Sequence, residues 1–218
     1  MHGVLELLPE LLRGARLTLE VTALAAVVAL ALAFAVGLAR LSRALPLRVA
    51  AMVYVEILRG TSALVQLFYL FFILPLFGIA LDPMATAVIG LGLNFSAYGS
   101  EIVRGAVLAI DRGQWEAAQA LDLSRLQTLR HVILPQAVLT MLPSFGNQLI
   151  ELLKATSLVS LITLTDLTFA GSRLITATGR PAEIWTLVLL LYFVMAFPLS
   201  RLTRGLERRL ALFKGAGR

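Results

Sequence analysis

The segment WEAAQALDLSRLQTLRHVILPQA, residues 115–137, is a charged and amphipathic island in a chain that is otherwise largely apolar. Apolar stretches long enough to cross a bilayer flank it on both sides. A segment of this size and polarity must lie in water, so the flanking stretches are expected to run through a membrane and turn back here. Its regular spacing indicates a surface offered to a soluble partner.

The composition supports this division. Of 218 residues, 59% are hydrophobic and 15% are charged, with a mean hydropathy of +0.87. Globular proteins are about 45–50% apolar and about 25% charged, so a water-soluble fold is not expected. Cysteine is absent and only two histidines occur, so no disulfide, metal site or catalytic constellation is predicted. The net charge of +6 does not indicate nucleic-acid binding, because the basic residues cluster just beyond the ends of apolar runs.

Five apolar segments approach the roughly 20 residues that a membrane-spanning helix needs. They are residues 17–39, 62–79, 84–110, 138–164 and 184–199. The expected fold is therefore an all-α integral membrane protein with five transmembrane helices. Residues 1–16 form an N-terminal external or interfacial segment, and the first span, at 23 residues, is longer than the apolar part of a signal peptide (about 7–15). Residues 49–61 are expected at the interface, 166–181 as a linker with a short helix, and 208–218 as a basic cytoplasmic tail.

Basic residues predict the orientation. Five spans place the termini on opposite sides of the membrane. With the C-terminus inside, fourteen Lys and Arg residues lie in the cytoplasm, and only Arg13, Arg16, Arg173 and Arg180 lie outside. This asymmetry follows the positive-inside rule, so the N-terminus is expected outside and the polar loop, residues 111–136, in the cytoplasm.

Two helices are expected within this loop. Asp111 with Gln114, and Ser124 with Gln127, each have the spacing of a capping box, which predicts helices over 112–121 and 125–132. Pro135 is expected to end the second helix, whose apolar face carries Leu126 and Leu129. From the pattern alone, a solvated connector remains the alternative.

The loop also resembles a known family motif. Glu116-Ala117-Ala118, three residues, Asp122, nine residues, Val132, one residue and Leu134-Pro135 is similar to the EAA loop of bacterial ABC-importer permeases. That family has Gly where this chain has Asp122, and Ile where it has Val132. The Gly suits a turn with positive φ, which Asp tolerates better than most residues.

Further motifs resemble the polar amino-acid uptake branch of that family, over roughly residues 15–207. They comprise Tyr54, Glu56, Arg59, Gly60, Thr61, Ser62 and Gln66, then Asn94, Tyr98, Glu101, Arg104 and Gly105, and finally residues 153–160. Gly60 and Gly105 can equally be close-packing or hinge positions. Residues 112–116, 150–156 and 161–169 also resemble permeases for ectoine and hydroxyectoine, which are zwitterionic as amino acids are.

The resemblance implies a type I ABC-importer permease fold and a set of partners in the bacterial inner membrane. These are a cytosolic ABC ATPase dimer, a second permease subunit (the same or a related chain) and an external substrate-binding protein. The chain has no G-x-x-x-x-G-K-[ST] motif, so ATP is expected on the ATPase and no cofactor on this chain. In the loop, Glu116 is an expected anchoring charge, Ala117 and Ala118 permit close contact, Asp122 makes the turn, and Leu126 and Leu129 fill the partner's groove.

Polar residues within the fourth span are the candidate substrate site. Asn147, Glu151 and Lys154 recur at spacings of four and three, so they share one helix face. Thr156 and Ser157 extend polarity to a neighbouring face. Charged side chains within a membrane usually face a bundle interior or a watery cavity. Glu151 and Lys154 are either a structural pair or a site for a zwitterion, with Lys154 toward its carboxylate and Glu151 toward its cationic nitrogen.

A proline and a glycine in the fourth span, and four charged residues elsewhere, have expected structural roles. Pro143 and Gly146 could break the fourth helix and free backbone groups to bind ligand, and Glu101, Arg104, Glu56 and Arg59 are expected in structural salt bridges. A membrane-embedded enzyme using Glu151, Lys154 or Asp166, and an ion channel or ion-coupled transporter, are the alternatives of a different class. The second of these leaves the capped loop unexplained.

Overall fold

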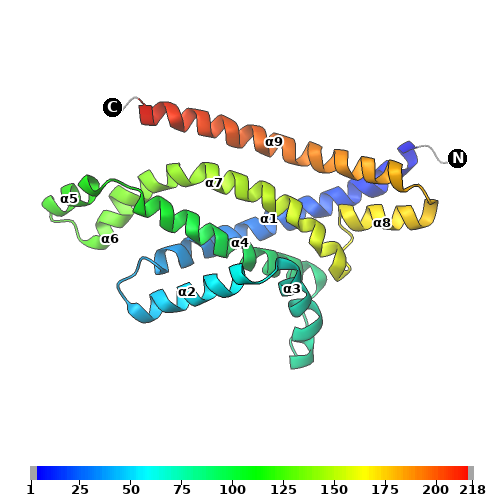
Figure 1. Ribbon diagram of the computed structural model, residues 1–218, viewed down its shortest axis with the longest axis horizontal. Helices are drawn as coiled ribbons and strands as arrows, with labels where there is room; N and C mark the ends of the chain where they lie inside the picture. The colour runs from blue at the N-terminus through cyan, green and yellow to red at the C-terminus, as the bar shows by residue number, and fades with distance from the viewer. Residues whose placement is uncertain (1–3, 216–218) are drawn as a thin grey trace.

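The computed structural model describes residues 4–215, with side chains from Leu7 to Arg208, and its elements are helices joined by short turns. Four long helices lie along one axis (Figure 1). They are α1 (Val4–Ala39), α4 (Pro83–Leu108), α7 (Leu134–Ala155) and α9 (Pro181–Gly215). The all-helical membrane-type fold expected from the apolar segments is therefore present.

Close packing of α1 against α4 forms the centre of the bundle. Small residues permit it: a Cβ at Gly99 would lie 2.7 Å from the Cβ of Ala33, and one at Gly92 would lie 2.7 Å from Cγ1 of Val28. Helix α7 packs on α4 from another side and is covered in turn by α9. The polar small residues Ser96 and Ser100 are buried within α4, and the Ser100 hydroxyl donates to the Ala97 carbonyl of its own helix.

The chain bends by 102° between α2 (Leu45–Gly60) and the segment that contains α3 (Ala63–Phe68), η1 (Tyr69–Ile73) and η2 (Leu74–Phe77). Gln66 holds the bend, because its Nε2 donates to the Leu58 carbonyl at 2.9 Å and to Thr61 Oγ1 at 2.7 Å. Asn94 of α4 donates to the same Leu58 carbonyl at 3.2 Å. Residues 62–79, expected as one span, therefore begin after a sharp bend and contain a succession of α, π and 3₁₀ turns.

The polar loop contains α5 (Arg112–Ala120) and α6 (Arg125–Gln127), so both expected helices are present. Residues of η3 (Thr128–Ile133), a π-helical stretch, lead from α6 directly into α7. Pro135 does not end a helix as expected. It occupies the first turn of α7, where a proline is tolerated because its missing N–H needs no partner.

Three segments outside the expected spans are helical. The N-terminal segment belongs to α1 from Val4 onward, and the tail continues α9 as far as Gly215. Residues 216–218 of the expected tail lie outside the described residues. The expected linker contains a full helix, α8 (Leu167–Thr178), which follows η4 (Thr156–Ile162). Asp166 caps α8 by accepting the backbone N–H groups of Thr168 and Phe169, which favours a helix start there.

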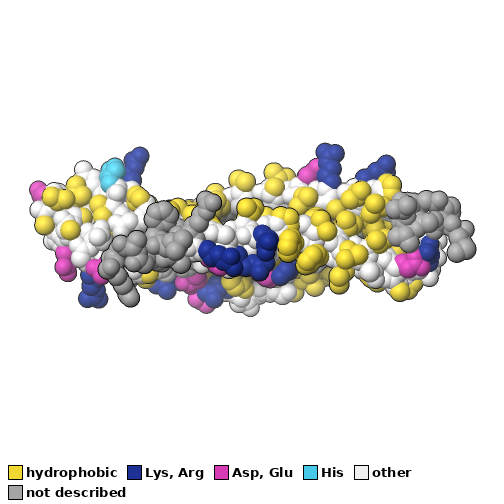
Figure 2. All heavy atoms as spheres, turned by 90° about the horizontal axis from the view of Figure 1, so that it is seen from above, with side chains coloured by type: hydrophobic (Ala, Val, Ile, Leu, Met, Phe, Trp, Pro, Cys, Tyr) yellow, Lys and Arg dark blue, Asp and Glu magenta, His cyan; other side chains and the backbone are white. Residues whose placement is uncertain are grey.

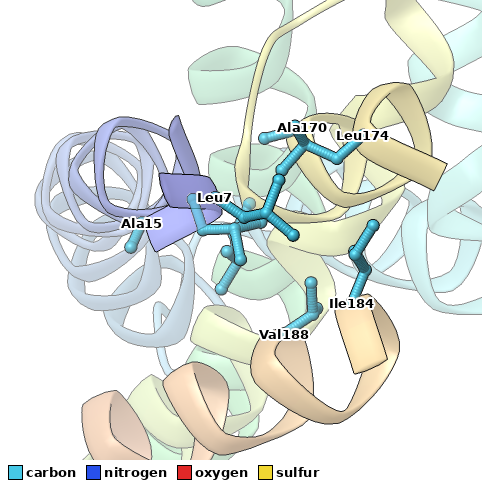
Figure 3. Packing of buried hydrophobic residues seen from close by; sticks show 8 residues of the cluster. Leu7, Ala15, Ala170, Leu174, Ile184 and Val188 are labelled. Carbon is cyan, nitrogen blue, oxygen red and sulfur yellow. The ribbon is translucent and has the colours of Figure 1, made fainter. Parts of the chain in front are cut away.

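The buried apolar residues form clusters at successive levels of the bundle. One joins the start of α1 to α8 and α9, where Leu7, Leu174, Ile184 and Val188 approach one another (Figure 3). A second, around Leu67 and Leu91, joins α1, α3, α4, α7 and η4. A third, around Val103, Ile133 and Met141, joins α4, η3 and α7.

Within the described residues, α1 and α9 are long and apolar enough to cross a membrane by length and composition. Counting the bent pairs α2 with α3–η2, and α6–η4 with α8, as one span each raises the number to four. Figure 2 shows hydrophobic side chains gathered over the right-hand half of one face, with basic side chains bordering them on the left. Exposed apolar residues of α9, including Leu189, Phe193 and Val194, suit contact with lipid rather than water.

Candidate functional site

The polar loop folds into a compact unit, here called the coupling segment (residues 111–133), at one end of the bundle (Figure 1). Ser124 and Gln127 form the complete capping box that their spacing predicts. Asp111 instead caps α5 through the Gly113 N–H alone. Asp122 has a φ of +55°, so it fills the left-handed turn position that the sequence analysis inferred for it.

The coupling segment is attached firmly to α7. The Gln136 side chain of α7 donates to Gln114 Oε1 of α5 at 3.1 Å and to the Val132 carbonyl at 2.8 Å. Ile133 is fully buried, and Trp115 and Leu129 pack around the same apolar cluster. Because η3 continues into α7 without a loop, a displacement of the coupling segment must move the start of α7.

The expected coupling residues differ in their exposure. Glu116 and Ala117 are exposed, whereas Ala118 is buried and packs within the chain. Leu126 is 74% exposed and free to contact a partner, while Leu129 packs mostly against the bundle. Leu121, which the sequence analysis did not single out, is 75% exposed at the end of α5. Its position one residue before the expected turn at Asp122 is the signal that could have identified it.

A row of polar side chains runs along one exposed face of α7. Asn147, Glu151 and Lys154 lie on it as expected, and Ser144 extends it by one turn. Lys154 Nζ lies 3.0 Å from Glu151 Oε1, and the two side chains are 57% and 65% exposed. Both charges thus point away from the chain's own core. Residues further along do not share this face, because Thr156 is buried and donates to the Leu153 carbonyl, and Ser157 is half-buried.

Helix α7 runs through Pro143 and Gly146 without the expected break, although Pro143, which lacks an N–H, cannot donate to the carbonyl of Leu139. Gly146 has a different role. A Cβ at this position would lie 2.5 Å from Oγ1 of Thr203, so Gly146 permits the close approach of α7 and α9.

Comparison with known proteins identifies the class of this chain. The family model described as "Binding-protein-dependent transport system inner membrane component" matches residues 28–212. The chain belongs to this family. It is 44% identical to the "Probable amino-acid ABC transporter permease protein y4tF" of Sinorhizobium fredii, over 93% of this chain and 88% of the relative. It is 39% identical to the "Glutamine transport system permease protein GlnP" of Escherichia coli, over 94% of each.

A solved structure agrees in fold along nearly the whole chain. The "Crystal structure of an amino acid ABC transporter with histidines" contains a chain with 34% sequence identity and a TM-score of 0.88, covering 96% of this chain and 99% of that one. The present chain is therefore the transmembrane permease subunit of an ABC importer and not an enzyme. The alternatives of an embedded enzyme and of a channel or ion-coupled transporter are set aside.

The permease also has a charge cluster centred on Glu101 of α4. Glu101 Oε1 lies 2.8 Å from Arg40 Nη1 at the end of α1 and 3.1 Å from Arg59 Nη1 at the end of α2, and Oε2 lies 3.2 Å from Arg104 Nε. The expected pairing of Glu101, Arg59 and Arg104 is confirmed, but Glu56 forms no ion pair among the described residues. The pairing of Arg40 with Glu101 was not predicted, because Arg40 was counted only as one of the basic residues that follow the first span.

Arg40 is the best-buried of the three arginines, with a side chain only 9% exposed. Its Nη1 lies near the carboxylate but is not aligned for a hydrogen bond, and its Nε has no partner within the described chain. Arg59 also lies over the ring of Tyr98, at 5.3 Å from the centroid. This cluster joins α1, α2 and α4 into one unit.

Gly60 and Gly105 are not close-packing positions within this chain, since a Cβ at either would meet nothing within 4 Å.

Proposed function

We propose that this permease imports a polar amino acid or a similar zwitterionic solute, using ATP hydrolysed by a cytosolic ATPase dimer. An external binding protein delivers the substrate, and a second permease subunit, identical or related, completes the pathway. Relatives named as amino-acid and glutamine permeases support this substrate class. Ectoine and hydroxyectoine remain a narrower alternative, because they present the same pair of opposite charges.

The proposed topology has five spans, with the N-terminus outside and the coupling segment and C-terminus in the cytoplasm. Its support is the distribution of basic residues and the placement of the coupling segment at one end of the bundle, opposite α8 (Figure 1). The bend of 102° after α2 is compatible with five spans if α2 and α3–η2 together make one crossing.

The observation that carries the proposal is the continuous helical path from the coupling segment to the polar face of α7. The α5 helix is hydrogen-bonded to α7 through Gln114 and Gln136, and η3 leads into α7 without a break. Closure of the ATPase on Glu116, Leu121 and Leu126 therefore displaces α7. The polar face with Asn147, Glu151 and Lys154 then changes the side of the membrane to which it opens.

The Glu151–Lys154 pair suits a zwitterion. When a substrate enters, its carboxylate can replace Glu151 as the partner of Lys154, and its cationic nitrogen can replace Lys154 as the partner of Glu151. Neither charge is then left unpaired in a site of lowered dielectric. Thr156 and Ser157 were expected to join this site, and only Ser157 remains a candidate contact, since the Thr156 hydroxyl is buried.

A charge reversal at Glu116 tests the proposal. In proteoliposomes that contain the whole transporter and its binding protein, Glu116→Lys is expected to lower substrate uptake per ATP hydrolysed, because it places a cation on the docking surface. Glu116→Gln is expected to have a smaller effect. Glu56→Lys, the same reversal at an exposed glutamate of α2, is the control. Normal coupling in Glu116→Lys, with ATPase co-purifying at the usual ratio, would overturn the assignment of the coupling segment.

A further inference from the structure

A groove of about 890 Å³ opens beside the coupling segment, and Asn147, Glu151 and Lys154 of the polar face of α7 do not line it. Its walls come from the end of α1, the turn before α2, the end of α4 and the coupling segment. Leu38, Leu108 and Leu126 are among its apolar lining residues, and Arg43, Arg112 and Arg125 are its charged ones. The groove is thus amphiphilic.

The three arginines have no carboxylate to balance them. No acidic residue lines the groove, and within the described chain Arg43, Arg112 and Arg125 form no ion pair or side-chain hydrogen bond. The neighbouring carboxylate of Asp111 is occupied by the Gly113 N–H. Guanidinium groups from three separate parts of the chain therefore surround one space, and a phosphate is the anion that their planar donors fit best.

The apolar walls require a second property of the ligand. Leu108 is 60% exposed and is not among the residues proposed to contact the ATPase, so a free inorganic anion would leave it in contact with water. Leu47 of α2 also lines the groove, and the residues Leu45, Val49 and Val53 next to it on α2 are exposed as well. The groove therefore continues into an apolar surface that suits lipid. A lipid acyl chain can enter the groove laterally along this surface.

The lining also includes Trp115, whose side chain is typical of the boundary between hydrocarbon and headgroups. Basic pockets between transmembrane helices at this depth bind anionic lipid headgroups. We propose that the groove binds an anionic phospholipid, with its phosphate among Arg43, Arg112 and Arg125 and one acyl chain along Leu38, Leu108 and Leu47. The leaflet, but not the binding itself, rests on the proposed orientation. The bound lipid connects the α1–α2 turn to the coupling segment.

Tryptophan fluorescence tests this directly, because the chain has only two tryptophans, Trp115 and Trp185. The full chain carrying Trp185→Phe is reconstituted in phosphatidylcholine vesicles that contain a small fraction of dibrominated phosphatidylglycerol or of dibrominated phosphatidylcholine. Half-maximal quenching of Trp115 is expected at an about tenfold lower fraction of the anionic lipid, since each basic residue adds to the attraction.

The groove variant Arg43→Gln/Arg112→Gln/Arg125→Gln is expected to abolish this preference. A matched control, Arg48→Gln/Arg130→Gln/Arg208→Gln, removes the same charge from exposed arginines that do not line the groove, and it is expected to keep the preference. If the groove variant does not fold, Arg43→Lys/Arg112→Lys/Arg125→Lys replaces it and is expected to weaken the preference.

Three results would overturn the proposal: equal quenching by the two brominated lipids, equal behaviour of the groove and control variants, or loss of quenching when millimolar inorganic phosphate is added. The last would assign the site to a soluble anion. None of these measurements involves an ATPase or transport. Their failure would leave the proposed function intact, and normal coupling in Glu116→Lys, which would overturn the proposed function, would leave the lipid site intact.

Discussion

The contact between Gly146 of α7 and Thr203 of α9 makes a sharp prediction about stability. A Cβ at position 146 would lie 2.5 Å from Thr203 Oγ1 and 2.8 Å from Cγ2, whereas ordinary contact begins at 3.4 Å. Thr203 cannot readily turn away, because it is buried, β-branched and donates to the Leu199 carbonyl at 2.9 Å. The helices must therefore separate by roughly an ångström if Gly146→Ala is to fold.

Such overpacking costs about 1–3 kcal/mol, and the better helix propensity of alanine returns about 1 kcal/mol. A net loss near 1 kcal/mol, the middle of the resulting range of about 0–2 kcal/mol, lowers the Tm of a chain of this size by about 2–4 °C. The measurement is thermal unfolding of the purified transporter in detergent, followed by tryptophan fluorescence.

Two companion variants isolate the cause. Thr203→Ala removes both of the nearest atoms and leaves only its Cβ, at 3.1 Å, so Gly146→Ala/Thr203→Ala is expected to regain most of the lost Tm. Gly205→Ala on α9 meets nothing within 4 Å and is expected to keep or raise the Tm. A Tm for Gly146→Ala equal to that of Gly205→Ala would refute the close approach of the two helices.

Three further variants address other contacts. Glu101→Gln leaves the buried Arg40 without its counter-charge and is expected to lower stability by about 2–3 kcal/mol, measured as Tm, with partial recovery in Glu101→Gln/Arg40→Gln. Asp166→Ala removes the acceptor for two N–H groups at the start of α8 and is expected to cost about 1–2 kcal/mol, whereas Asp166→Asn, which also caps helices well, is expected to cost less in the same Tm assay. Lys154→Ala is expected to weaken transport of a substrate that has a carboxylate without preventing assembly, and unchanged uptake kinetics in proteoliposomes would leave Lys154 with a structural role only.

Local signals in the sequence predicted part of this structure well. Ser124 and Gln127 make their capping box because both partners lie within one helical turn. Asp122 adopts positive φ because the preference is a property of the residue and of its position after α5. The apolar segments predicted the approximate places of the long helices α1, α4, α7 and α9, because apolar composition is also a local property.

The features that were missed depend on contacts between distant residues. The bend after α2 is held by the hydrogen bonds of Gln66 and Asn94 to one carbonyl, that of Leu58. Arg40 reaches Glu101 from a different helix. The role of Gly146 likewise depends on Thr203 of another helix, which a side chain at position 146 would contact. The periodicity of a sequence does not show which residues of separate helices are in contact, so these pairs could be identified only from the structure.

The polar contacts near the coupling segment form two groups, one that joins α1 to α4 and one that joins the coupling segment to α7. Glu101 with its arginines, and Asn94 with Gln66, tie α1, α2, α3 and α4 together. Gln136 ties the coupling segment to α7, and the Gly146–Thr203 contact ties α7 to α9. Between α4 and α7, the side-chain hydrogen bond recorded in the described chain is that from Gln148 to the Phe95 carbonyl.

The rest of the α4–α7 interface is apolar, built on Val103, Val107, Ala137 and Met141. Apolar contact is non-directional, so it tolerates a small shift better than a hydrogen-bonded contact does. We therefore expect a pull on the coupling segment to shift the start of α7 along α4, whereas α8 and the start of α9 stay joined to α1 through the Leu167 N–H bond to Thr18, the Arg173–Glu10 ion pair and the cluster around Leu7 and Val188. Such a shift leaves the Glu101 cluster intact, which fits the change of access proposed above.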